Sequence, residues 1–103
     1  MVQKVAGFDW DKGNREKCEK HGVSLAEIEA VFRHQPHVAP DIGHSDIEAR
    51  FLAIGKGDGA RFIFVAFTLR KIMGETFIRP ISARYMHRKE IEHYEKAASN
   101  LDH

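Results

Sequence analysis

The sequence has little cysteine and no long hydrophobic run. Cys18 is the only cysteine, so an intramolecular disulfide and a zinc site made of cysteines alone are excluded. Cys18 lies in the charged, helix-like stretch REKCEKHG. A small packing residue is the simplest interpretation there, and a catalytic thiol paired with His21 is the alternative. No segment approaches the roughly 20 apolar residues of a membrane helix. Asp9 and Asp11 interrupt any signal-peptide core, so we expect a cytoplasmic protein without a membrane partner.

Common catalytic signatures are also missing. There is no Walker motif, dinucleotide fingerprint, nucleophile elbow or metal box. The segment GKGDG (55–59) lies between two predicted strands rather than before a helix, so it indicates a hairpin turn and not a phosphate loop. His34, His37, His44 and Asp46 could be drawn as a zinc site, but their spacing matches no known motif. We therefore expect neither a metal nor a cofactor.

What is present is typical of a globular protein. The chain has 103 residues, of which 43% are hydrophobic and 30% charged, and the length fits one domain, residues 1–103. The formal net charge is only +1, yet its distribution is uneven. Residues 1–50 contain seven Lys/Arg and nine Asp/Glu, whereas residues 51–103 contain nine and six. The excess of positive charge therefore lies in the second half.

Hydrophobic patterning predicts the element order β-α-α-β-β-β-α. The clearest signal is the second helix, where Ser24 caps the N-terminus and Glu27 completes a capping box. Residues 34–46, with two prolines and a glycine, read as irregular. The predicted strands are 4–8, 50–56, 61–69 and 76–84, and the predicted helices are 11–21, 23–33 and 87–99. On the last helix, Ile91, Tyr94, Ala98 and Leu101 share one face.

The last three strands follow one another too closely for crossover connections, so they form an antiparallel meander. Helices packed on this small antiparallel sheet give an α+β fold. The nearly continuous apolar run at 61–69 predicts a central strand covered on both faces. Pro80 cannot donate a ladder hydrogen bond, so the strand at 76–84 is an edge strand or contains a bulge.

Arginines gather in and around these strands, and they are the main candidates for binding. Their planar forks donate two hydrogen bonds and stay charged, which suits phosphodiesters. Simple alternation places Arg84 on the face of Ser82 and opposite Arg79, unless a bulge at Pro80 shifts the phase. The alternative is a solvated rim of arginines at the strand ends. The set comprises Arg50, Arg61, Arg70, Arg79 and Arg84, with Arg88 on the following helix.

The junction EKHGVS offers candidates for proton transfer. Lys20 and His21 lie at a predicted helix C-terminus, where the helix dipole favours cations without any further role. They could equally transfer a proton or contact a phosphate. The residues alone leave both interpretations open.

Three segments together resemble the BrnT family of toxins from type II toxin–antitoxin systems: FDWDKGNREKCEKHGVSLAEIEAVF (8–32), HSDIEARFLAIG (44–55) and IRPISARYMHRKEIEHYE (78–95). The resemblance includes the F-x-W-D start, the K-H-G-V-S junction, the E-x-R strand and the R-x-I-S-A-R strand before an E-x-x-x-Y helix. It implies a RelE-like ribonuclease that inhibits translation. It also implies neutralisation by a BrnA-like ribbon-helix-helix antitoxin, operator DNA bound only through that antitoxin, and a possible heterotetramer.

The chemistry of RNA is compatible with this resemblance, because a 2′-OH can attack the adjacent phosphate without a metal. We assign Arg79 and Arg84 to phosphate binding and transition-state charge, with Arg50, Arg61, Arg70 and Arg88 as further RNA contacts. Lys20, His21 or Glu48 would transfer protons, and Tyr94 would orient or stack. Two alternatives remain: a non-catalytic module that binds the antitoxin or RNA, and a metal-dependent hydrolase using the histidines of 34–46.

Overall fold

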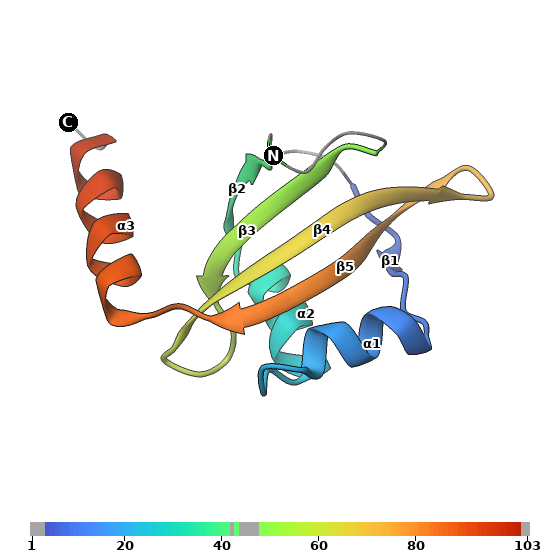
Figure 1. The fold of residues 1–103 in the computed structure, drawn as a ribbon. Coiled ribbons are helices and arrows are strands. Elements are labelled where there is room, and N and C mark those ends of the chain that lie inside the picture. Colours follow the sequence, from blue (N-terminus) through green and yellow to red (C-terminus); the bar gives the residue numbers. More distant parts are fainter. Residues whose placement is uncertain (1–3, 42, 44–47, 102–103) are drawn as a thin grey trace.

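A computed structural model describes residues 4–41, 43 and 48–101, with the side chains of 98–101 left undescribed (Figure 1). The element order is β-α-α-β-β-β-β-α, one strand more than predicted. The elements are β1 (Gly7–Phe8), α1 (Lys12–Glu19), α2 (Leu25–Arg33), β2 (His37–Pro40), β3 (Arg50–Lys56), β4 (Phe62–Ile72), β5 (Glu75–Tyr85) and α3 (Arg88–Leu101).

The strands form one five-stranded sheet with the order β1-β5-β4-β3-β2. The predicted meander of β3, β4 and β5 is confirmed, since these neighbours are antiparallel. A wholly antiparallel sheet is wrong, because β1 pairs with β5 in parallel and the sheet is mixed. The α+β class is nevertheless confirmed.

The extra strand, β2, lies in the segment predicted to be irregular. It pairs antiparallel with β3, from His37 opposite Ile54 to Pro40 opposite Phe51. Since β2 is the last strand of the sheet, one side of its backbone needs no ladder partner, and proline is tolerated there. The prolines that suggested a loop are therefore compatible with an edge strand.

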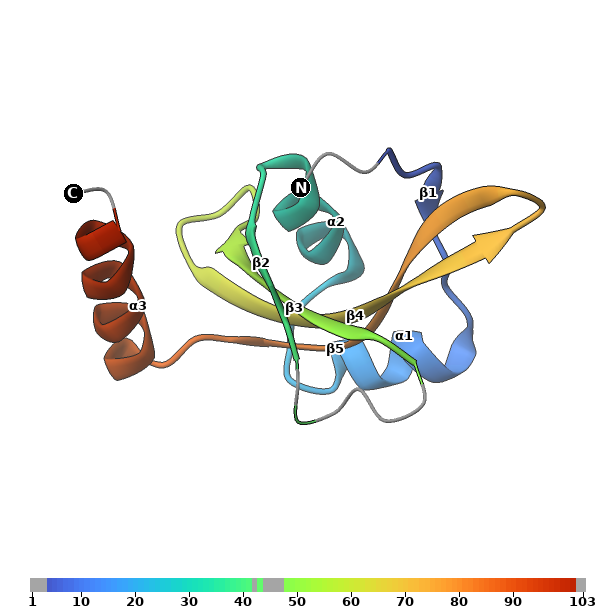
Figure 2. The ribbon, with the colours of Figure 1, turned by 90° about the horizontal axis from the view of Figure 1, so that it is seen from above.

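Helix α2 covers one face of the sheet and forms the core with it (Figure 2). Its predicted capping box is confirmed, since Ser24 and Glu27 satisfy each other's backbone amides. Ile28 of α2 and Val65 and Phe67 of β4 are fully buried. The prediction that β4 is covered on both faces is wrong, because Phe64 and Ala66 on the other face are only half-buried, although Thr68 on that face is buried.

Helix α1 packs along β5 and carries the cysteine. Asp11 caps the helix and Asn14 completes the cap, while Gly22 adopts a φ of 86° just beyond the helix. Cys18 is fully buried in the core, and burial raises the pKa of its thiol to about 11. A packing role for this residue is confirmed.

Strand β5 contains a bulge at Pro80. Ser82 pairs with Ala66 and Pro80 pairs with Phe67, which leaves Ile81 as the extra residue. The edge-strand alternative is wrong, since β5 lies between β1 and β4. Beyond the bulge, the side-chain alternation of β5 is shifted by one residue relative to β4.

Helix α3 projects from one end of the sheet instead of covering it (Figures 1 and 2). Tyr94 provides its contact with the sheet, since its ring packs against Phe62 with centroids 5.6 Å apart and its hydroxyl contacts His37. The expectation that the helices pack on the sheet therefore holds for α1 and α2. Ile91 and Tyr94 are both half-buried, whereas the side chains of Ala98 and Leu101 lie outside the described part. In that part, no helix is long and apolar enough to span a membrane.

Candidate functional site

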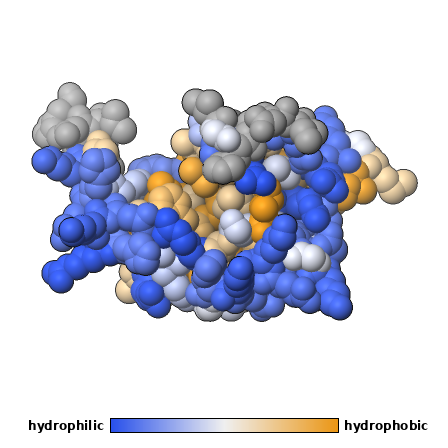
Figure 3. Space-filling view, in the orientation of Figure 1, coloured by the Kyte–Doolittle hydropathy of each residue, from blue (hydrophilic) through white to orange (hydrophobic). Residues whose placement is uncertain are grey.

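The sheet face that α2 does not cover is the candidate site, and we call it the open face (Figure 3). Residues paired across antiparallel strands point to the same face, so the register of β3, β4 and β5 identifies its members. Figure 3 shows hydrophobic side chains in the middle of this face, between α3 and the polar surface around α1. Three rows make up the face: Arg50–Thr68–Arg79, Leu52–Ala66–Ser82 and Ile54–Phe64–Arg84.

The bulge at Pro80 brings the two principal arginines to this one face. Arg79 pairs with Thr68, and Arg84 pairs with Phe64 four residues earlier on β4. Simple alternation, which would place Arg79 and Arg84 on opposite faces, is therefore wrong here. Arg50 lies in the same row as Arg79, through its own pairing with Thr68.

At one end of the open face is a hollow of about 520 Å³ with a strongly basic lining. Arg70 in this lining lies 3.7 Å from Glu48, measured from Nη2 to Oε2. The lining therefore combines four cationic side chains with one carboxylate, an excess of positive charge that favours anions. The charged residues concerned are Lys17, Glu48, Arg50, Arg70 and Arg79.

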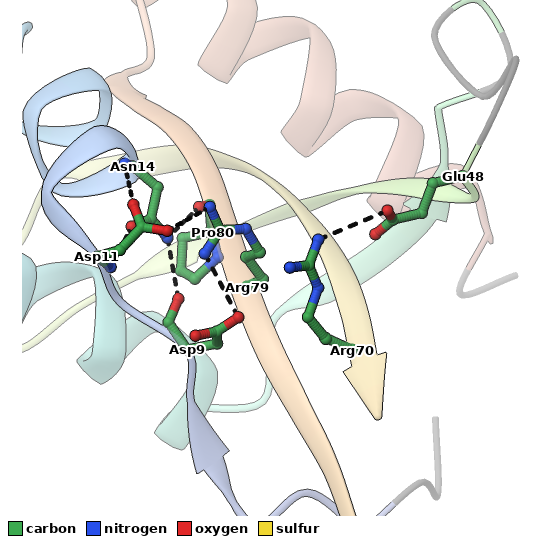
Figure 4. A network of polar contacts seen from close by, with 7 residues as sticks. All are labelled: Asp9, Asp11, Asn14, Glu48, Arg70, Arg79 and Pro80. Carbon is green, nitrogen blue, oxygen red and sulfur yellow. Dashed lines mark hydrogen bonds and ion pairs between the residues drawn. The ribbon is translucent and has the colours of Figure 1, made fainter. Parts of the chain in front are cut away.

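Arg79 is held by two carboxylates at the start of α1 (Figure 4). Its Nη2 donates to Asp11 over 2.7 Å and its Nη1 to Asp9 over 3.4 Å. The backbone amide of Asn14 lowers the pKa of Asp11 most, and the Arg79 guanidinium lowers it further, so this carboxyl stays ionised. Only 20% of the Arg79 side chain is exposed, which fixes its position at the edge of the hollow.

Arg84 is held in the same manner by the start of α3. Its Nη1 and Nη2 donate to the two carboxylate oxygens of Glu90 over 2.8 and 2.7 Å. These bonds and the amide of His87 lower the pKa of Glu90 to about 2. The guanidinium lies 4.8 Å from the centre of the Phe64 ring. Both principal arginines are therefore ordered, and both already have carboxylate partners.

A second hollow, of about 320 Å³, places His21 near Arg84. His21 follows α1, and the hollow extends from it over Ser82 and Arg84 to Asp41, which follows β2. An imidazole can donate or accept a proton near neutral pH. The structure thus places an imidazole and a guanidinium around one space.

Tyr94 closes the far end of the open face. It lines a hollow with Ile54, Phe64 and Met86, between α3 and the sheet. Burial raises the pKa of its hydroxyl, which therefore remains protonated at neutral pH. An aromatic ring in this position offers a stacking surface for a base.

Three of the expected residues lie elsewhere. The Arg61 guanidinium stacks 3.5 Å above the ring of Tyr85, whose hydroxyl donates to Glu27 of α2, so Arg61 belongs to the covered face. Arg88 is 92% exposed on α3, beside Glu92. Lys20 is exposed at the C-cap of α1.

Three residues that line these hollows were not among the expected site residues. Lys17 joins the basic hollow, and its spacing of four residues from His21 could have indicated a shared face of α1. Ser82 and Asp41 line the hollow of His21. No sequence signal identifies Asp41, because its position depends on the unpredicted β2.

Two of the histidines considered for a zinc site contact other side chains. His34 lies 2.9 Å from Asp58, and His37 contacts Tyr94. His44 and Asp46 are outside the described residues. Within residues 4–41, 43 and 48–101, no three metal-ligating side chains come together.

Comparison with known families identifies this arrangement. The profile of a family described as "Ribonuclease toxin, BrnT, of type II toxin-antitoxin system" matches residues 10–90, which is most of the chain. The chain belongs to the BrnT family. Among curated individual proteins, no relative is found. The BrnT match runs from before α1 to the first turn of α3 and so includes all three rows of the open face, but not Tyr94. Membership makes this protein a ribonuclease toxin with an antitoxin partner.

Proposed function

We propose that this BrnT protein is a metal-independent endoribonuclease that cleaves RNA on the open face. The observation that supports it is the bulge at Pro80, which places Arg79 and Arg84 on one face with Arg50, next to His21. Basic groups over a partly apolar floor suit single-stranded RNA, which presents both phosphates and unstacked bases.

The proposed reaction is an internal transfer of the phosphoryl group. The ribose 2′-oxygen attacks the adjacent phosphorus and loses its proton to a base. The bond from phosphorus to the 5′-oxygen breaks, and that oxygen accepts a proton. The products are a 2′,3′-cyclic phosphate and a 5′-hydroxyl. The protein must align the attack, transfer two protons and stabilise the negative charge of the transition state.

The residues divide these tasks. Arg79 and Arg84 hold the phosphates and stabilise the developing charge. His21 transfers one of the two protons, and Glu48 is the candidate for transferring the other. Tyr94 orients a nucleobase at the end of the face.

The ion pairs of the two arginines are compatible with this role. The Arg84–Glu90 pair is partly exposed, and exposed ion pairs contribute little to stability, so a phosphate can replace Glu90 at small cost, whereas the less exposed Arg79 keeps its carboxylate partners. Arg84 donates two hydrogen bonds to Glu90, so its guanidinium fork is already directed at an anion. A phosphodiester presents two oxygens to the same fork.

We extend the proposal to the partner and the setting that the family resemblance implies. The antitoxin is a ribbon-helix-helix protein of the BrnA type, which binds operator DNA for the complex, and toxin and antitoxin form a heterotetramer. The toxin has a RelE-like fold, acts in the cytoplasm and stops translation by cutting RNA.

The same ion pairs favour one alternative, a module that binds an acidic antitoxin segment or RNA and cuts nothing. Expression in a test host discriminates the two. The proposal predicts growth arrest, cleaved RNA with cyclic phosphate ends, and activity that persists with EDTA. The double variant Arg79→Ala/Arg84→Ala should remain folded and lose all of this, whereas Arg88→Ala should retain it. A folded wild-type protein that binds RNA without cleaving it would establish the alternative.

A further inference from the structure

We propose that Asn14 is the positioning residue of the site, because it holds the Pro80 bulge that brings Arg79 to the open face. This inference rests on the proposed function, and it assigns a positioning role to a side chain that lines the basic hollow but whose polar atoms all bond within the protein. It starts from the most buried polar side chain of α1, which is only 4% exposed.

The side-chain amide of Asn14 joins three separate segments (Figure 4). Its Nδ2 donates to the carbonyl of Asp9, just after β1, and to the carbonyl of Pro80 in β5, both over 2.9 Å. Its Oδ1 accepts from the backbone amide of Asp11 over 2.7 Å. Each donor and the acceptor therefore has a partner, and a buried amide satisfied in this manner has a single orientation.

The bond to Pro80 is at the bulge itself. Beyond Phe77 and Ile78, which pair with β1, no further β1 pairing continues along β5. The Pro80 carbonyl on this side accepts from Asn14, so a helix side chain replaces the missing strand neighbour. An extra residue disrupts the ladder locally, so its position depends on such outside contacts.

The same cap also determines the direction of Arg79. One oxygen of Asp11, Oδ1, accepts from the backbone amide of Asn14 over 3.0 Å. The other, Oδ2, accepts from Arg79 over 2.7 Å. Asn14 therefore holds the Asp11 carboxylate that orients Arg79, and it also holds the Pro80 bulge.

The substitution Asn14→Asp tests this role with almost no change of shape. It retains an acceptor for the amide of Asp11 but removes both donated hydrogen bonds. We expect kcat for RNA cleavage to fall at least tenfold, with KM changed less than threefold, because Arg79 is displaced while the other basic groups still bind RNA. Asn14→Ser retains one donor and should recover part of kcat. If Asn14→Asp does not fold, the loss of kcat in Asn14→Ser tests the same role.

A double-mutant cycle separates positioning from loss of structure. In the Arg79→Ala background, Asn14→Asp should cause no further loss of kcat per folded molecule. In the Arg84→Ala background, Asn14→Asp should lower kcat by the same factor as it does in the wild-type protein. Equal losses in both backgrounds would show that Asn14 acts only on folding, and the inference would be overturned.

A readout that does not depend on cleavage keeps the two proposals distinct. The Arg79 Nε–Hε resonance, assigned by its absence in Arg79→Lys, should shift in Asn14→Asp and not in Lys12→Ala. If the wild-type protein cleaves no RNA but the resonance shifts, the ribonuclease proposal fails and the positioning role stands. An unshifted resonance would refute the positioning role, whatever the activity.

Discussion

The salt dependence of RNA binding measures how many phosphates the open face contacts. Binding of a single strand releases counterions, and the slope of log K against log salt is about −0.7 for each phosphate neutralised. The open face and its basic hollow contain five cationic groups: Lys17, Arg50, Arg70, Arg79 and Arg84. The largest slope they allow is about −3.5, which is roughly a 100-fold loss of affinity between 50 and 200 mM salt.

The perturbation is Arg84→Ala, and Arg88→Ala is its matched control. Both remove one guanidinium with a carboxylate partner, but Arg88 is 92% exposed on α3 and lies outside the three rows of the open face. Arg84→Ala should make the slope shallower by about 0.7. The loss of affinity between 50 and 200 mM salt should then be roughly 50-fold instead of 100-fold. Arg88→Ala should leave the slope unchanged.

Fluorescence anisotropy with a labelled 2′-O-methyl oligonucleotide gives these affinities, because an RNA without a free 2′-OH cannot be cleaved. Three salt concentrations suffice to define each slope. An unchanged slope for Arg84→Ala, or an equal reduction for Arg88→Ala, would refute the assignment of the open face as the RNA site.

Three further predictions concern stability and reactivity. Phe67→Ala should lower the free energy of unfolding by about 3–5 kcal/mol in urea titrations, since the ring is fully buried, whereas Phe67→Leu should cost roughly 1 kcal/mol. The pairing of Glu90 with Arg84 should stabilise the protein fully above pH 4.5, the ordinary pKa of the carboxyl, and this contribution should be lost as the pH falls towards 2. Calorimetry should show a smaller acid destabilisation for Glu90→Gln, and an equal one would contradict the ion pair. Cys18 should react with a thiol reagent at pH 8 far more slowly in the native protein than in denaturant, because burial raises its pKa to about 11; equal rates would contradict its burial.

Local signals in the sequence predicted local structure well. Ser24 and Glu27 form their hydrogen bonds within one turn, so the capping box located the start of α2 without knowledge of the rest of the fold. The β3–β4–β5 meander was equally accessible from short connections. Strand β2 was missed because Pro36 and Pro40 are also typical of loops, and only its place at the edge of the sheet reconciles them with a strand.

The site was less predictable because it depends on distant parts of the chain. Pro80 indicated an edge or a bulge, and the choice required the pairing of β5 with β1, about seventy residues away in sequence. The partners of Arg79 are 68 and 70 residues distant, so no spacing rule reveals them. The bond from Arg84 to Glu90 spans six residues but crosses from a strand to a helix, where neither periodicity applies.

The most direct test of the central claim is a methyl NMR titration of the protein with 2′-O-methyl RNA. The methyl groups of Leu52, Ile54 and Ala66 lie on the open face, and those of Ile63 and Val65 lie under α2. The account predicts chemical-shift changes for the first set that saturate with RNA, and little change for the second. Changes confined to the methyl groups under α2, or to the β4–β5 turn at Met73, would contradict it.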